Sequence, residues 1–160
     1  MAQSAFTADA SWRSAHLGHW LRLALERFDA RVMECMAQHA GVPLGLSNLA
    51  ARGQVSAAHI HITRHLPVAG ARLTELAQAA GMSKQAMGTL VNQCEAWGMV
   101  RREGDAADAR ARRVLFTEAG LSWLAAYREA VAQAEAELRA AVGDEVATVV
   151  ALGLEAYSGG

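Results

Sequence analysis

The sequence predicts a mainly α-helical fold with a small β-hairpin, and three observations lead to this prediction. The chain has 160 residues, 52% of them apolar, which is enough to form the core of one domain. Apolar residues recur at steps of three and four along most of the chain, as they do in amphipathic helices. There are only two prolines, which are poorly tolerated inside helices.

The N-terminal quarter is expected to form one long helix. Residues 1–10 show no periodicity and are expected to be a flexible tail. The helical pattern runs from Ser11 to about Ala40 and ends before Pro43, because proline cannot continue a helix. Segment 41–54 is rich in glycine and is expected to be a connector, with one helical turn around residues 46–51.

Two short helices are expected next. Ser56 is expected to cap a helix that reaches about His65, because serine is a preferred N-cap residue. Residues 72–80 have the pattern of a two-turn amphipathic helix. Gly81 follows as a left-handed stop.

A further helix begins after the expected N-cap Ser83 and ends at Gly98. Its apolar residues share one face: Met87, Leu90, Val91, Cys94 and Trp97. Helix, glycine-containing turn and helix together form a helix-turn-helix unit. Residues 99–103 and 111–116 then predict a β-hairpin whose polar tip is segment 104–110.

The C-terminal part is again expected to be helical. Thr117 is expected to cap a long helix that reaches about Val142. Gly143 breaks the chain, and Asp144 is expected to cap a last apolar helix through Leu154.

A helix-turn-helix followed by a hairpin is the plan of a winged helix, whose second helix lies in the DNA major groove. Gln85 and Asn92 carry amides suited to bidentate adenine contacts, and Lys84 is suited to phosphate or guanine. Thr89 is suited to a thymine methyl or a phosphate, and Gly88 permits close approach to the groove. The alternative is an ordinary solvated helix face.

Arginines of the hairpin give a second set of candidates. A wing-tip arginine can enter a narrow minor groove, and Asp108 is placed to hold Arg110 by a charge-assisted hydrogen bond. The alternative is a surface loop with weak ion pairs. The full set of candidate DNA-binding residues is Ser83, Lys84, Gln85, Gly88, Thr89, Asn92, Arg101, Asp108, Arg110 and Arg112.

Charge is distributed unevenly along the chain. Residues 83–113 contain six basic and four acidic residues, whereas the whole chain has a formal net charge of −1. Residues 83–113 are therefore modestly basic, and the rest of the chain is acidic. This distribution bears on binding partners and not on the fold. A winged-helix module that binds a protein and no longer binds DNA is kept as an alternative.

Five runs of sequence resemble MarR-type regulators. They are Leu73-Thr74-Glu75-Leu76-Ala77, Gly81-Met82-Ser83-Lys84-Gln85-Ala86-Met87, Glu95-Ala96-Trp97-Gly98-Met99-Val100-Arg101-Arg102, and Asp105-Ala106-Ala107-Asp108-Ala109-Arg110-Ala111 followed by Phe116-Thr117-Glu118-Ala119-Gly120. The resemblance is close over about residues 72–121 and architectural on either side. The Asp-x-Arg wing with the following Thr-Glu-x-Gly is its most specific part.

This resemblance implies a homodimeric winged-helix transcription factor. Such a protein would bind a palindromic operator, usually repress, and often release DNA on binding a small molecule or on oxidation. Asp108 and Arg110 map onto the wing-tip pair of the family, and residues 84–92 map onto its recognition helix. Cys94 stands where the family usually has leucine, which indicates a core thiol.

The flanking helices carry more apolar surface than one small domain can bury. We therefore expect residues 11–40 and 117–157 to form a helical dimerisation region, with residues 55–116 as the winged helix-turn-helix domain. A symmetric dimer would place its two recognition helices ~34 Å apart, one turn of DNA.

Histidines are the unusual feature of the sequence. Two pairs, His16 with His19 and His61 with His65, are each spaced to share one helix face. Three interpretations remain open: a metal or haem site, a pocket for a small aromatic or other organic effector, or ordinary surface and core histidines. The expected pocket, with Arg64 pairing an effector carboxylate, is lined by Trp12, His16, Trp20, His61, Arg64 and His65. No resident cofactor is predicted.

Several other classes are disfavoured. No apolar run approaches the ~18 residues of a membrane span, the N-terminus lacks a secretory-signal pattern, and the two cysteines are too far apart for a zinc motif, so we expect a cytoplasmic protein. Redox sensing by Cys35, one turn from Arg31, is a weaker hypothesis. His59 and His61 point about 200° apart on a helix, and no catalytic motif is found, so no enzyme is predicted.

Overall fold

The computed structural model describes residues 10–55, 57–105 and 108–159. A 3₁₀ turn, η1, covers Ala10–Arg13, and the α-helices are α1 (Leu17–Gln38), α2 (Leu44–Ala51), α3 (Ala57–His65), α4 (Leu73–Ala79), α5 (Lys84–Ala96), α6 (Glu118–Val142) and α7 (Asp144–Ser158). The strands are β1 (Ala71–Arg72), β2 (Val100–Asp105) and β3 (Asp108–Phe116). The predicted fold class, mainly α with a small β-hairpin in a winged helix-turn-helix, is confirmed.

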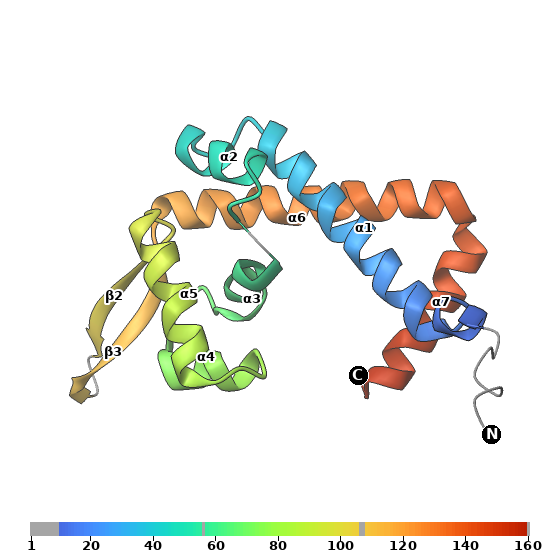
Figure 1. Cartoon of the computed structure of the whole chain (residues 1–160). Coiled ribbons are helices and arrows are strands. Elements are labelled where there is room, and N and C mark those ends of the chain that lie inside the picture. The colour runs from blue at the N-terminus through green and yellow to red at the C-terminus, as the bar shows by residue number, and fades with distance from the viewer. Residues whose placement is uncertain (1–9, 56, 106–107, 160) are drawn as a thin grey trace, which may run out of the picture.

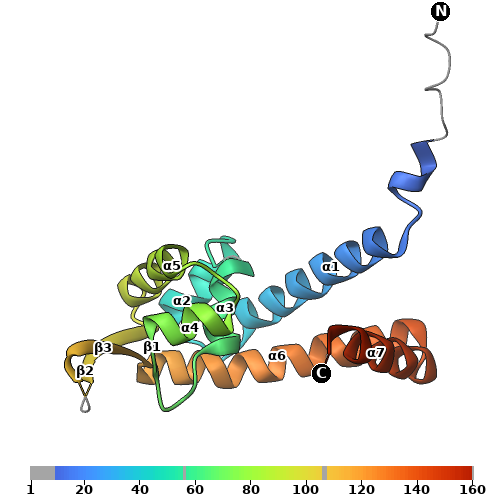
Figure 2. The ribbon, with the colours of Figure 1, turned by 90° about the horizontal axis from the view of Figure 1, so that it is seen from below.

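The long helix α6 connects the two ends of the molecule (Figure 1). At its N-terminal end it adjoins the sheet and helices α3, α4 and α5, which together form the winged part. Helix α7 folds back against its other end, and α1 crosses it on the way (Figure 1). Seen from below, the N-terminal end of α1 points away from α6 (Figure 2). Among the described residues, no helix has the length and apolar character needed to cross a membrane.

The hairpin belongs to a three-stranded antiparallel sheet of order β1-β3-β2. Its two long strands pair from Val100 opposite Phe116 to Asp105 opposite Asp108, so most of the segment expected as a polar tip is strand. Strand β1 pairs Ala71 with Val114. The sequence analysis missed β1 because two residues are too short to show an alternating pattern.

The start of the N-terminal helix differs from the prediction. The helix does not run from Ser11: α1 begins at Leu17, after the 3₁₀ turn. His16 has an extended backbone and caps α1, because its Nδ1 accepts a hydrogen bond from the backbone N–H of His19 at 3.2 Å. The connector contains the two-turn helix α2, longer than the single turn expected.

The last helix also begins differently. Gly143, with φ of 92°, is the N-cap of α7, and Asp144 is its first helical residue, so the cap predicted at Asp144 is wrong. An acidic side chain at this place still favours the helix, because the N-terminus of a helix carries partial positive charge. The helix continues to Ser158, past the expected end at Leu154. The N-cap predicted at Ser56 lies outside the described residues.

The core is continuous between the long helices α1 and α6 and the winged part. Trp123 of α6 is 1% exposed, and its indole N–H donates to the hydroxyl of Thr63 on α3 at 3.3 Å. Met36 of α1, Ile62 of α3 and Met87 of α5 belong to the same buried cluster. The winged part therefore shares a core with α1 and α6.

The start of α6 makes a close contact with the chain that leads into β2. Thr117 caps α6 as predicted: its hydroxyl accepts from the backbone N–H of Gly120 at 3.0 Å, and its own backbone N–H donates to the carbonyl of Met99 at 3.1 Å. A Cβ on Gly120 would lie 2.0 Å from the carbonyl oxygen of Met99. The Thr-Glu-x-Gly sequence thus allows a helix to begin directly against backbone.

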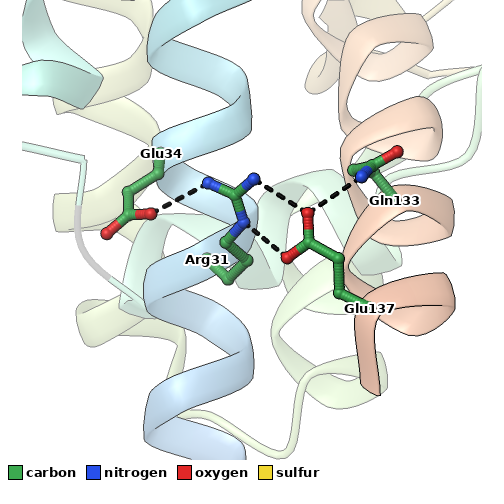
Figure 3. A network of polar contacts seen from close by, with 4 residues as sticks. All are labelled: Arg31, Glu34, Gln133 and Glu137. Atoms are coloured by element: carbon green, nitrogen blue, oxygen red, sulfur yellow. Dashed lines mark hydrogen bonds and ion pairs between the residues drawn. The ribbon is translucent and has the colours of Figure 1, made fainter. Parts of the chain in front are cut away.

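A polar network joins α1 to α6 (Figure 3). The Arg31 guanidinium donates to both carboxylate oxygens of Glu137, from Nε at 2.7 Å and from Nη2 at 2.8 Å. Glu34 accepts a third hydrogen bond from Arg31 at 3.0 Å, and Gln133 donates to Glu137 at 2.8 Å. The hydrogen bonds from Arg31 and then Gln133 lower the pKa of Glu137 to about 2.

Gly120→Ala is expected to lower the free energy of unfolding by roughly 2–3 kcal/mol, because the added methyl forces α6 away from the Met99 carbonyl. The measurement is chemical denaturation followed by circular dichroism. Gly45→Ala is the matched control: a Cβ there meets nothing within 4 Å on α2, so stability should stay equal or rise. Equal behaviour of the two variants would contradict the close contact.

The Arg31–Glu137 pair is expected to contribute a pH dependence to stability. The pKa of Glu137 is lower in the folded state than in the unfolded chain, so its contribution is complete above about pH 4.5 and is lost as the pH falls towards 2. Glu137→Gln should therefore reduce the melting temperature at pH 6 and converge with the parent protein near pH 2. Thermal melts across this range test it, and a constant difference between the two proteins would contradict it.

Candidate nucleic-acid interface

Helix α5 is held in place by its cap and its buried face. Ser83 accepts from the backbone N–H of Ala86 at 3.1 Å, which confirms the predicted N-cap. Gly81, with φ of 62°, makes the left-handed turn between α4 and α5. Of the five apolar residues expected to share the inward face, four are buried, namely Met87, Leu90, Val91 and Cys94, and Trp97 is partly buried against the core.

The opposite face of α5 is exposed to solvent. Lys84, Gln85, Thr89 and Asn92 all lie on it, as the spacing predicts. The Thr89 hydroxyl donates to the carbonyl of Gln85 at 3.2 Å, so its methyl group and oxygen lone pairs remain for other contacts. Gly88 is half-buried beside α4, where an added Cβ would lie 3.7 Å from Leu73. The DNA-binding roles of these residues remain predictions.

Arg102 on β2 connects the hairpin to α5, a role that was not predicted from the sequence. Its Nη2 donates to Oδ1 of Asn92 at 2.7 Å, and its Nη1 pairs with the Glu95 carboxylate. Its backbone N–H also donates to Glu95 at 3.2 Å. The signal in the sequence is the opposite charge of Glu95 on α5 and Arg102 on β2, two elements joined by a single turn at Gly98.

The other arginines of the hairpin have different surroundings. Arg101 donates to Glu103 at 2.7 Å and to the carbonyl of Phe116 at 3.1 Å, along the sheet. Arg113 donates to the carbonyls of Ala69 and Gly70, and so fixes the loop before β1. Arg112 is exposed.

The predicted wing-tip pair lies at the start of β3. The backbones of Asp108 and Arg110 belong to β3, but their side chains lie outside the described part of the chain. Their pairing stays a prediction.

The inner end of α5 contacts α3 through a histidine. His59 is 6% exposed, and its Nε2 lies 2.6 Å from Oε1 of Gln93. The His59 ring also packs against Trp97, with 4.6 Å between ring centroids. His59 thus helps to pack α3 against α5, a role that the spacing of His59 and His61 alone does not indicate.

The six residues expected to line one effector pocket lie around the N-terminal end of α1 and on α3, and the pocket stays a prediction. Trp12, His16 and Trp20 lie at the N-terminal end of α1, and both tryptophans are more than half exposed. Arg64 and His65 lie at the end of α3, beside the other half of α1 (Figures 1 and 2). Helical spacing shows which residues share a face, but it does not show which helices meet. The His61 side chain lies outside the described residues.

Arg64 has two partners within the chain. It donates to Asp29 on α1 at 3.2 Å and to the Tyr127 hydroxyl on α6 at 3.3 Å. It therefore ties α3 to both long helices. An open cavity of about 460 Å³ lies beside this contact, lined by Arg22, Leu25, Glu26, Asp29, Ala30, Met33 and Ile60.

The two cysteines differ in burial. Cys94 is fully buried, and burial raises the pKa of its thiol to about 12, so it is a core thiol as expected. Cys35 is partly buried on α1. In the part of the chain that the structure describes, no three His, Cys, Asp or Glu residues cluster as metal ligands.

Residues 60–111, about a third of the chain, match the model of the MarR family. The predicted resemblance is confirmed. The fold resembles that of the transcriptional repressor CouR bound to a 23-mer DNA duplex, with 21% identity over 94% of this chain and 97% of that one and a TM-score of 0.66.

Other MarR-type structures agree with this fold. Apo MarR from E. coli is 20% identical over 88% of this chain and 96% of its own, with a TM-score of 0.63. BpsR from Bordetella bronchiseptica, whose DNA binding is regulated by 6-hydroxynicotinic acid, is 17% identical over 91% and 94%, with a TM-score of 0.63. No curated protein sequence matches the chain significantly.

Proposed function

We propose that this protein is a homodimeric, DNA-binding transcriptional regulator of the MarR type, without enzymatic activity. The observation that carries the proposal is α5, which is capped, backed by a buried apolar face, and exposes a polar face beside an arginine-bearing hairpin. This is the geometry in which a helix enters a major groove while a wing reaches the neighbouring backbone. A structural neighbour with the same fold, CouR, is a repressor bound to a DNA duplex.

The contacts divide by chemistry. Lys84 and Arg112 are exposed cations suited to phosphate, and Gln85 and Thr89 are suited to base edges. Arg101, along the sheet, would add a backbone contact, and Arg110 a contact in the minor groove. Occupation of an operator that overlaps a promoter would then repress transcription.

Dimerisation is supported by apolar surface that the single chain leaves open. On α7, only Ala147 is buried among the described residues. The exposed apolar side chains of α7 are Val146, Val149, Val150, Leu152, Leu154 and Tyr157, and those near the start of α1 are Leu17 and Trp20. Both sets lie at the same end of the molecule, away from the winged part (Figure 1). A patch of this kind marks an interface, and a two-fold dimer would match a palindromic operator.

The cavity between α1 and α3 is the proposed effector site. Its apolar side chains, Leu25, Met33 and Ile60, suit an aromatic ring, and it adjoins the Arg64–Asp29 contact. A ligand carboxylate that competes with Asp29 for Arg64 would loosen α3 from α1, and α3 packs on α5. Effector binding would in this way release DNA.

Lys84→Ala and Arg112→Ala are each expected to weaken binding to duplex DNA from the protein's own upstream region, and to lower the salt slope by about 1. Fluorescence anisotropy at two salt concentrations measures both effects, and the same assay screens aromatic carboxylates for release. Arg27→Ala, an exposed arginine on α1, is the charge-matched control and should change neither quantity. Absence of binding by the parent protein at low salt would refute the proposed function.

Val149→Glu is expected to break the dimer, because Val149 is 70% exposed in the single chain and lies on the apolar face of α7. Sedimentation analysis should give twice the 17.0 kDa chain mass for the parent protein and a large monomer fraction for the variant. Val68→Glu is the control, since Val68 is 65% exposed but lies in the winged part. A parent protein that sediments as a monomer would refute the homodimer.

A further inference from the structure

The side chain of Asn92 has a fixed orientation on the recognition helix. Its amide faces Arg102, with Oδ1 2.7 Å from Nη2. A guanidinium has five N–H donors and no acceptor, so only the amide oxygen can face it. The NH₂ group of Asn92 is therefore directed away from Arg102, on the exposed face of α5.

Arg102 can impose this orientation because it is itself held. Its guanidinium pairs with Glu95, one turn along α5 from Asn92, and its backbone N–H donates to the same carboxylate. Residue 102 is also paired in the sheet opposite Val114. The Arg102 side chain is only 22% exposed, so its position is constrained by both the wing and the helix.

We propose that Arg102 is a specificity-determining residue: it turns Asn92 into a hydrogen-bond donor that selects guanine at one position of each DNA half-site. The inference rests on the proposed DNA-binding function. It replaces the bidentate adenine contact expected from the sequence, because that contact needs Oδ1 as the acceptor for the adenine amino group. Arg102 already donates to one lone pair of that oxygen, and its positive charge beside Oδ1 disfavours a second N–H donor there.

The chemistry of the base edges favours guanine over the other three bases. In the major groove guanine presents two adjacent acceptors, N7 and O6. Cytosine presents an amino donor, which would meet the NH₂ of Asn92 donor to donor. Adenine places such a donor beside its one acceptor, and thymine has one acceptor beside a methyl group.

The test is selection of bound duplexes from a randomised library by the parent protein and its variants. The parent should show guanine at one position per half-site, and Asn92→Ala should lose that preference alone. Arg102→Met, of similar length but without donors, should admit adenine there because the amide is free to turn. Arg101→Met is the matched control: it should weaken binding to all duplexes and keep guanine.

A single-atom substitution sharpens the result. Replacing that guanine with 7-deazaguanine removes the N7 acceptor and should weaken binding of the parent roughly fivefold, the effect of about one lost base contact, with no change for Asn92→Ala. If Arg102→Met has a lower melting temperature than the parent, Glu95→Gln is tested in its place, because it weakens the contact that holds Arg102.

The outcomes separate the two proposals. A defined site with adenine, thymine or cytosine at the Asn92-dependent position overturns the inference and leaves the regulator intact. So does a base pattern that neither Asn92→Ala nor the Arg102 and Glu95 variants alter. Failure of the parent to select any duplex overturns the proposed function and the inference together.

Discussion

The close approach of Gly120 to the Met99 carbonyl is the constraint on which the arrangement of the molecule depends. It allows α6 to begin directly against the strand that follows the recognition helix, and Trp123 then inserts into the shared core. From that point α6 continues out to α7 without a break (Figure 1). Helix α6, which leads to the exposed apolar side chains of α7, thus begins in contact with the chain that enters β2. The positions of the hairpin and of α7 are therefore linked through α6.

Helix α3 connects three other helices through side chains that lie close together on it. His59 contacts α5 through Gln93, Thr63 accepts a hydrogen bond from Trp123 on α6, and Arg64 holds Asp29 on α1. Ile60, between them, lines the cavity. A change in the separation of α1 and α3 would therefore act on α5 through a single short helix, which has few ways to absorb the displacement.

Local patterns predicted the elements well where the chain is periodic and capped. The Ser83 and Thr117 caps and the buried face of α5 follow from spacing and side-chain chemistry alone. The start of α1 did not follow, because a histidine is an uncommon cap and the apolar pattern continues across the break. The lining of an effector pocket is harder to predict, because whether Trp20 meets Arg64 depends on helix crossing, which no local pattern encodes. The partners of Asn92 and Arg64 likewise depend on contacts between elements.

The pairing of charges on the winged part bears on how it would bind DNA. Arg101 is matched with Glu103 and Arg102 with Glu95, so two hairpin cations already have carboxylate partners before any phosphate approaches. An arginine in such a pair gains less free energy from counterion release when it binds DNA, because the phosphate must compete with the carboxylate. Affinity would then depend less on bulk charge, in keeping with a formal net charge of −1, and more on hydrogen bonds whose direction is set in advance. The Glu95–Arg102–Asn92 contacts lower the electrostatic contribution of one arginine and in return orient the amide beside it.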